Sequence, residues 1–385
     1  MSFLQSLASA FKGGASPRVP LARTFTSPWL YSEGSAKAPF DYSRAVKRAY
    51  IDNPVAQRAV RLVAEGIGGA PLGPVDPGLA ALVSATSAGQ SLLETLASQL
   101  LLHGNAYVQV IKDGAGAPVE LFALRPERVS VIAGADGWPS GYAYKVGETA
   151  LSIPVLDEDA SPNLIHIKYF HPVDDHYGAS CLAAAEEAVA SHNAAAAWNR
   201  SLLENAARPS GALVYDPGDG GGLSADQFDR LKHELSEAYA GHANAGRPML
   251  LEGGLKWQAL SLSPSDMDFA ELKAAAARDI ALAFGVPPML LGLPGDATYA
   301  NYREANRALW RLTLLPLASK LLAALSEGLV TWFPDQRLSV DLDRIPALAE
   351  DRERLWSQIG SAEFLSADEK RAMLGLAPQE QGNKS

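Results

Sequence analysis

Residues Ser263 to Pro316 read SPSDMDFAELKAAAARDIALAFGVPPMLLGLPGDATYANYREANRALWRLTLLP. Helical periodicity occupies both ends of this stretch, and glycine and proline interrupt its middle. The stretch is therefore predicted to form a helix, a loop and a second helix, around which the rest of the chain is arranged.

The first helix has sequence signals at both ends. Ser263 can cap its start, Pro264 suits the first helical position, and Gly285, followed by two prolines, ends it. One apolar stripe should pack against the core. Its members are Phe269, Leu272, Ala276, Ile280 and Phe284.

The loop and the second helix follow the same logic. Gly292, Pro294 and Gly295 prevent regular structure, so an exposed loop is expected. The second helix contains Pro316, which removes a backbone donor and should bend it.

The runs RDIALAFGVPPMLLG and YANYREANRALWRLTLLP resemble the signature of portal proteins of tailed bacteriophages, in the HK97-type branch. Upstream segments resemble the same family in the same order: NPVAQRAVRLVAEGIGGAPL, LLLHGNAYVQVIKD, LRPERVSV, YGASCLAAAEEAVASHNAA and RPSGALVYDP. The resemblance covers residues 40 to 335. Because the chain is short for such a protein, a phage portal and the portal of a phage-like gene transfer agent both remain open.

The resemblance implies an α+β portal fold assembled as a ring. In chain order its parts would be an N-terminal arm (1–40), a helix-and-sheet wing (41–177), a stem helix (178–208), a small α/β clip insert (209–262), a second stem helix (263–286), a tunnel loop (287–301), a kinked helix returning to the wing (302–340) and a helical C-terminal crown (341–385). From the residues alone, an alanine-rich core helix and a plain domain insertion are the alternatives to the first stem helix and the clip.

The function that the resemblance implies is a dodecameric ring at one capsid vertex, assembled in the host cytoplasm and retained in the particle. The ring would pass double-stranded DNA without reading its sequence. The implied partners are the terminase large subunit, a head-tail connector or adaptor and the major capsid protein. No catalytic residue, metal or cofactor is expected.

Three sets of candidate site residues follow. The tunnel loop would meet DNA through Leu293, Gly295, Asp296, Thr298 and Tyr299. The stem acids that could repel phosphate in the channel are Glu186, Glu187, Asp266, Asp268, Glu271 and Asp279. The clip would dock partners through Phe228, Lys232, Glu234, Lys256 and Trp257. Periodicity leaves open which acids face the channel and which face an arginine of a neighbour.

Elsewhere, alternation predicts one antiparallel sheet backed by helices, with strands in AYVQVIK, PVELFAL, RVSVIA, YAYKV and LIHIKYF. Helices are predicted over 54–67, from Leu92 to Gly104, over 179–206, after a Ser224 cap with Gln227 at its third position, and over 345–359 and 366–374. Gly253 and Gly254 suggest a hairpin. Residues 3–11 suggest a short amphipathic arm or an untethered tail.

Charge and composition bound the class of protein. The net charge is −10, yet residues 1–60 hold eight basic and three acidic residues, so the remainder sums to −15. An acidic body argues against tight binding to the phosphate backbone. The single cysteine excludes an intrachain disulfide. Pro316, Lys320 and Glu327 interrupt the longest apolar run, so no membrane association is expected.

Two other functions stay open. The chain lacks a G-x-x-x-x-G-K-[ST] phosphate-binding loop, but His166, His171 and Asp174 could serve a metal-dependent hydrolase. The chain could also be a head adaptor that borrows the portal pattern without forming a ring, and the size of the purified particle separates that reading from a portal.

Overall fold

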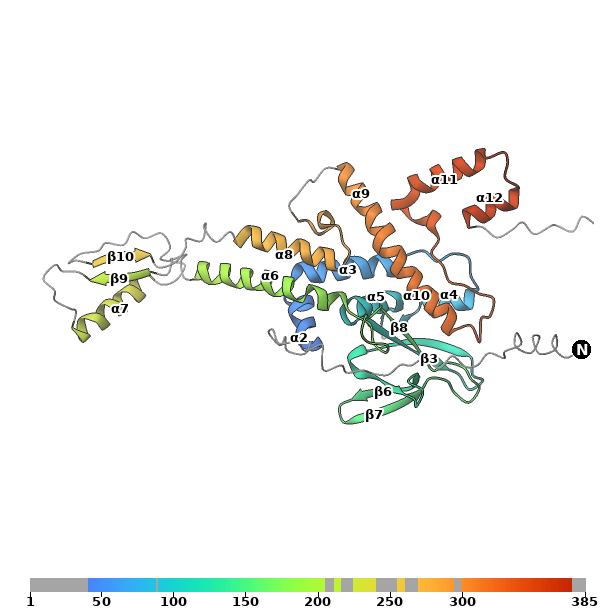
Figure 1. Ribbon diagram of the computed structural model, residues 1–385, viewed down its shortest axis with the longest axis horizontal. Coiled ribbons are helices and arrows are strands. Elements are labelled where there is room, and N and C mark those ends of the chain that lie inside the picture. The colour runs from blue at the N-terminus through green and yellow to red at the C-terminus, as the bar shows by residue number, and fades with distance from the viewer. Residues whose placement is uncertain are drawn as a thin grey trace, which may run out of the picture. The chain divides into compact units, whose positions relative to one another are not determined.

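The computed structural model describes residues 41–87, 89–204, 211–215, 224–239, 255–259, 269–293 and 299–375 (Figure 1). The chain divides into two compact units. The first unit comprises the chain up to residue 42, residues 61–183 and residues from 307 onward. The second unit comprises residues 43–60 and 184–306. The predicted N-terminal arm lies outside the described residues.

The first unit contains two three-stranded antiparallel sheets, where the sequence predicted one. One sheet has the order β4 (Pro118–Leu124), β3 (Asn105–Lys112), β8 (Leu164–Lys168). The other has the order β5 (Val129–Ala133), β6 (Pro139–Val146), β7 (Thr149–Pro154). Strand β7 was not predicted, because only one of its six residues is buried and its apolar pattern is correspondingly weak.

The two sheets share one core. A single buried cluster takes one side chain from each of the six strands: Tyr107, Leu124, Val129, Tyr142, Ile153 and Leu164. The rings of Tyr107 and Tyr142 meet edge-on with centroids 5.9 Å apart. The predicted number of sheets was wrong because the strands pair within two sheets instead of one. The predicted strands themselves are present, and their inward side chains meet as expected for packed sheets.

Helices cover this core. Helix α5 (Leu92–His103) buries Leu96 and Leu100 and ends at Gly104, whose φ is +82°. Helices α3 (Pro54–Gly68) and α4 (Pro77–Ser84) precede it, and Asp76 caps α4. The short strands β1 (Thr86–Ser87) and β2 (Gln90–Ser91) form a hairpin before α5. The predicted helices near 54 and 92 are confirmed.

The long helix is irregular next to Pro316, where the sequence predicts a bend. Helix α9 (Tyr299–Leu309) continues as a π-helical turn, η6 (Trp310–Leu314), into α10 (Leu315–Gly328). Pro316 is the second residue of α10. The backbone hydrogen bonds therefore change to the π-helical pattern just before the residue that has no N–H to donate. Helix α9 begins at residue 299, three residues before the predicted start at 302.

Within the described chain, residues Asn301–Gly328 form one helix long and apolar enough to cross a membrane by length and composition alone. In this structure apolar side chains of that helix pack against the core. Leu317, Leu321 and Leu325 of α10 are buried, and α10 packs against α5 and β8. A core helix meets the same criteria, and the packing of α10 favours that explanation.

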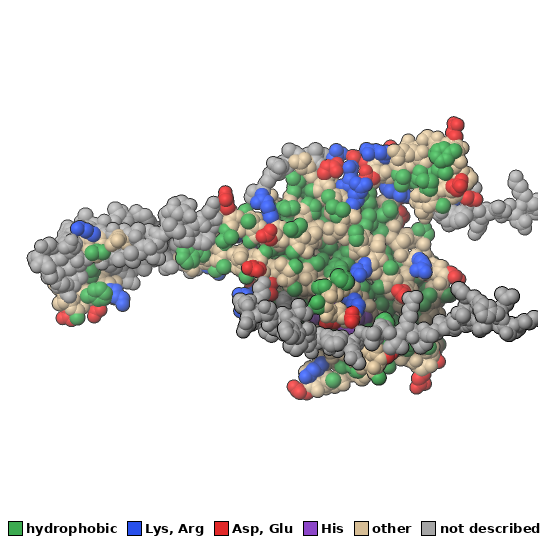
Figure 2. Space-filling model, viewed as in Figure 1, with side chains coloured by type: hydrophobic (Ala, Val, Ile, Leu, Met, Phe, Trp, Pro, Cys, Tyr) green, Lys and Arg blue, Asp and Glu red, His purple; other side chains and the backbone are tan. Residues whose placement is uncertain are grey.

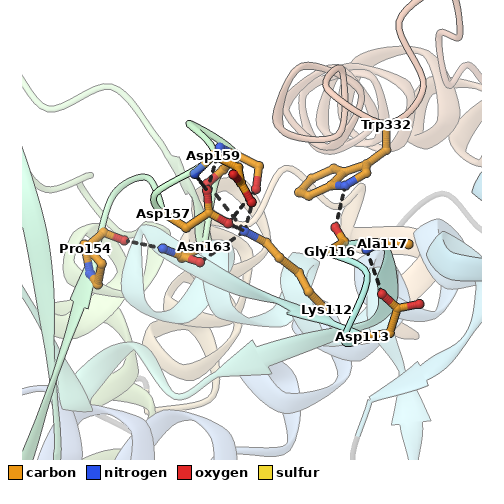
Figure 3. A network of polar contacts seen from close by, with 10 residues as sticks. Lys112, Asp113, Gly116, Ala117, Pro154, Asp157, Asp159, Asn163 and Trp332 are labelled. Carbon is orange, nitrogen blue, oxygen red and sulfur yellow. Dashed lines mark hydrogen bonds and ion pairs between the residues drawn. The ribbon is translucent and has the colours of Figure 1, made fainter.

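A polar network ties three connections of the first unit together (Figure 3). Lys112 Nζ pairs with Asp157 and donates to Asn163 Oδ1 at 3.2 Å. The same ammonium lies 5.4 Å from the ring centroid of Trp332, whose Nε1 donates to Gly116 O at 2.9 Å. Partly buried Lys112 and Trp332 together thus join the β3–β4 turn, the β7–β8 connection and the segment after α10.

The C-terminal helices are close to prediction. After the 3-10 turns η7 (Leu342–Arg344) and η8 (Pro346–Leu348), α11 spans Ala349–Ser361 and α12 spans Ala367–Leu374. Helix α11 starts four residues later than predicted because Pro346 opens a 3-10 turn instead. Ser366 and Glu369 form a capping box at α12, and Arg307 Nη2 pairs with Glu350 Oε2 at 2.7 Å.

Candidate functional site

The second predicted stem helix lies in the second unit, and so does the first from residue 184 onward. Helix α6 spans Cys181–Glu204 and α8 spans Phe269–Ala283, and Figure 1 shows them side by side. The predicted start of α8 at Ser263 lies outside the described residues. Small residues make up much of the buried faces, which include Ala185 and Ala195 of α6 and Ala276, Ala277 and Ala281 of α8. Small side chains allow two helices to approach closely.

A buried polar link anchors α6. Asn53 is fully buried, and its Oδ1 caps α3 by accepting from the backbone N–H groups of Val55 and Ala56. Its Nδ2 donates to His192 Nδ1 at 3.1 Å and to Asn193 Oδ1 at 2.9 Å. Because Nδ1 of His192 accepts, the imidazole is neutral with its proton on Nε2. Burial lowers the pKa of His192, and the nearby charge of Lys273 on α8 lowers it further.

The stem acids are exposed where the structure describes them. Glu186 and Glu187 lie on α6, and Glu271 and Asp279 lie on α8. Asp266 and Asp268 lie outside the described residues. Basic Lys273 and Arg278 also lie on α8, so the described part of that helix has no net charge. Figure 2 shows acidic and basic side chains interspersed on the visible face.

The predicted tunnel loop is described at its two ends. After α8, Gly285 adopts a φ of +66°, and the 3-10 turn η5 (Pro288–Leu291) closes at Gly292, whose φ is +72°. Leu293 is half-buried. Gly295, Asp296 and Thr298 lie outside the described residues, and Tyr299 is the first residue of α9.

The predicted clip forms a strand-helix-strand unit. Strands β9 (Gly211–Tyr215) and β10 (Leu255–Ala259) pair antiparallel, with Trp257 opposite Leu213. Helix α7 (Ala225–Tyr239) has the predicted capping pair, because Ser224 N donates to Gln227 Oε1 and Gln227 N donates to Ser224 Oγ. The proposed hairpin at Gly253 and Gly254 lies outside the described residues.

The clip residues chosen from the sequence fall on two elements. Phe228 and Lys232 are exposed one helical turn apart on α7, where Glu234 also lies. Lys256 is exposed on β10. The side chain of Phe228 is 58% exposed.

The histidine cluster has other roles in the structure. His166 Nε2 lies 3.1 Å from Asn105 Oδ1, and its ring stacks on Tyr107 with centroids 4.3 Å apart. Burial lowers the pKa of His166 to about 3. Asp174 Oδ1 accepts two backbone N–H groups of the following turn. Over the described residues no group of three or more His, Cys, Asp or Glu side chains could hold a metal ion.

Asn105 organises this region, and sequence reasoning missed it. The side chain is 1% exposed, and besides meeting His166 its Oδ1 accepts from Gly178 N at 2.8 Å. A Cβ on Gly178 would lie only 2.1 Å from Gly104 O, so two backbones touch here. The only sequence signal was a glycine on each contacting segment.

Comparison with known proteins gives a consistent picture. The sequence pattern of the family described as "Phage portal protein" matches residues 54–375. An uncharacterized protein of Rickettsia felis (strain ATCC VR-1525 / URRWXCal2) is 39% identical over 353 residues, covering 87% of this chain and 90% of that protein. The probable portal protein of Streptomyces phage phiC31 is 28% identical over 307 residues, covering 76% of this chain and 64% of that protein.

Solved structures agree. A chain in the virion of a native gene transfer agent is 48% identical, with a TM-score of 0.68 over 91% of this chain and 98% of that one. A chain in the neck of a native gene transfer agent particle, computed with C12 symmetry, is 50% identical, with a TM-score of 0.68 over 89% and 95%. An HK97 family phage portal protein from Corynebacterium diphtheriae is 18% identical, with a TM-score of 0.56 over 78% and 98%, and shares the fold. The predicted α+β fold of the HK97 type is therefore confirmed.

Proposed function

The chain belongs to the phage portal protein family, and on that premise we propose that it forms a dodecameric ring in the neck of a phage-like particle. The family is structural rather than enzymatic, so the metal-dependent hydrolase is set aside. The observation that carries the proposal is the 50% identity to a chain of a gene transfer agent neck computed with C12 symmetry. A ring repeats one head-to-tail interface, so each copy needs two different contact surfaces.

The proposed path of double-stranded DNA follows the stem. Helices α6 and α8 would border the channel, and the tunnel loop would project toward the axis. Exposed Glu186, Glu187 and Asp279 would repel phosphate, so that DNA slides without being held. The basic residues on α8 would then face neighbouring copies, since like charges around a ring need compensation.

The proposed partners dock at the ends of the ring. The clip would seat the terminase large subunit during packaging and the head-tail connector afterwards, with the major capsid protein around the wing. Exposed Phe228 and Lys232 on α7 provide an apolar and a charged contact for such partners. The particle would be a gene transfer agent or a related phage.

The size of the purified protein tests the ring. Twelve copies of a 40.8 kDa chain give a particle of about 490 kDa, and end-on electron micrographs should show a central hole. A monomer at neutral pH and micromolar protein concentration would refute the ring and favour the head adaptor. Deleting residues 215–262 should affect ring formation less than it affects terminase binding, and retained binding would refute the clip assignment.

Charge reversal tests the channel. The Asp279→Lys ring should retain double-stranded DNA with an affinity that falls steeply as salt rises, because a ring multiplies each added cation. Glu353→Lys, at an exposed position on α11, provides the matched control and should add little binding. Equal retention by the two variants would place Asp279 away from the channel.

A further inference from the structure

The loop 169–180, which connects β8 to α6, presents large apolar side chains to solvent. Phe170 is 84% exposed and Val173 is 69% exposed. Isolated exposed apolar residues are common on protein surfaces, so exposure by itself decides nothing. What distinguishes this loop is how firmly its backbone is held.

Both ends and the middle of the loop are anchored. Tyr169 N donates to Gly104 O at 2.9 Å, and Gly178 N donates to the buried Asn105 Oδ1 at 2.8 Å. Asp174 Oδ1 fixes the intervening turn by accepting two backbone N–H groups at 2.8 and 2.9 Å. Since the backbone is already ordered, the displayed apolar side chains can bind a partner at little further cost in conformational entropy.

The chain enters the described structure close to this loop. The ring of Tyr42 meets the ring of His103 edge-on, with centroids 4.7 Å apart. His103 precedes Gly104, which accepts the hydrogen bond from Tyr169, the residue before Phe170. The point at which residues 1–40 leave the body is therefore only a few side chains from Phe170.

Those N-terminal residues have a matching composition. Phe25, Trp29, Leu30 and Tyr31 form an aromatic and apolar group, and the ten residues from there to Asp41 can span about 35 Å when extended. Residues 1–40 carry four basic residues and one acid, a net charge of +3, so the remainder of the chain carries −13. The acidic residues of the loop itself are Asp174 and Asp175.

We propose that residues Phe25–Tyr31 dock on Phe170 and Val173 of the same chain. The short connection gives the segment an effective concentration of about a millimolar at the loop, so even modest apolar contacts suffice. The docked segment would cover an apolar surface that would otherwise promote association with other proteins. The contact does not require the ring, so a test of the contact does not depend on the portal function.

Site-specific photocrosslinking of the full chain tests the contact. With Phe170→benzoylphenylalanine, irradiation followed by trypsin should join the loop to the peptide Thr24–Lys37, which trypsin releases by cutting after Arg23 and Lys37. The matched control is Phe364→benzoylphenylalanine, because Phe364 is 86% exposed and lies in the same unit. It should give no such crosslink.

Two further measurements make the result decisive. Trp29→Ser combined with Leu30→Ser should reduce the Phe170 crosslink to the level of the Phe364 control. In a mixture of isotopically heavy and light chains, the crosslinked peptides should come from one chain. Mixed heavy-light products, an equal yield at Phe364, or the absence of the Thr24–Lys37 peptide would each overturn the proposal, while the particle size measured on the same sample reports on the ring.

Discussion

Asn53 Nδ2 donates a hydrogen bond to His192 Nδ1 over 3.1 Å and so joins two segments that are 139 residues apart in the chain. The same asparagine caps α3 through its Oδ1, and its neighbour in the link, Asn193, donates to Arg48 O at 2.9 Å. The middle of the long helix α6 is thus held by side-chain hydrogen bonds as well as by apolar packing.

Asn53→Ala should destabilise the protein by about 2 to 4 kcal/mol. Loss of the cap costs about 1 kcal/mol, and the stranded Nδ1 of buried His192 adds about 1 to 3. Urea unfolding followed by circular dichroism measures the change. Asp76→Ala removes only the half-buried cap of α4 and should cost about 1 kcal/mol. Equal losses in the two variants would show that the link to His192 contributes nothing.

Stability should fall as the pH drops from 6.5 toward 4.5. Burial lowers the pKa of His166 to about 3 and lowers the pKa of His103 and His192, so between those values and 6.5 the unfolded chain binds protons that the folded chain excludes. Each such proton costs about 1.4 kcal/mol per pH unit. The lowered pKa values of Asp157 and Asp343 act in the same direction, but only near and below their ordinary value of 3.8.

His166→Gln isolates one histidine in that range. Glutamine can still donate to Asn105 Oδ1 but does not titrate, so the slope of the unfolding free energy against pH should decrease by about 1.4 kcal/mol per unit between pH 6 and 4.5. The variant should be compared with the parent by urea unfolding at each pH. An unchanged slope would mean that His166 is not the neutral buried group described above.

Gly178→Ala should be severely destabilising, by about 3 kcal/mol or more, because the new Cβ would lie 2.1 Å from Gly104 O and 2.7 Å from Tyr169 N. Backbone atoms cannot move aside as a flexible side chain can. Gly114→Ala is the control, since a Cβ there meets nothing within 4 Å. Thermal unfolding measures both variants, and similar melting temperatures would contradict the close backbone approach.

Substitutions of Trp332 should separate its two contacts. Trp332→Phe keeps an aromatic ring for Lys112 but loses the bond to Gly116 O, at about 1 kcal/mol, whereas Trp332→Leu also loses the cation–π contact and should cost about 1 kcal/mol more. In a Lys112→Met background the difference between the two variants should disappear. A difference that persists there would assign it to packing of the ring alone.

The apolar pattern of the sequence, together with its glycine, proline and capping residues, was sufficient to locate most helices and strands. Gly104 ends α5, the Ser224 and Gln227 pair opens α7, and Ser366 opens α12, because capping depends on side chains within a few residues of the helix end. Family resemblance also identified the α+β portal fold. These features are local in sequence, or recur together in one order along the chain.

Tertiary structure alone decided how those elements combine. Which strands share a sheet, why Gly178 must lack a side chain, and why Asn105 and Asn53 are buried all depend on partners far away in the chain. No periodicity within one segment encodes the position of another segment. The role of a single asparagine or glycine therefore cannot be predicted from its own segment. It becomes clear only when the fold places another backbone or a histidine beside that residue.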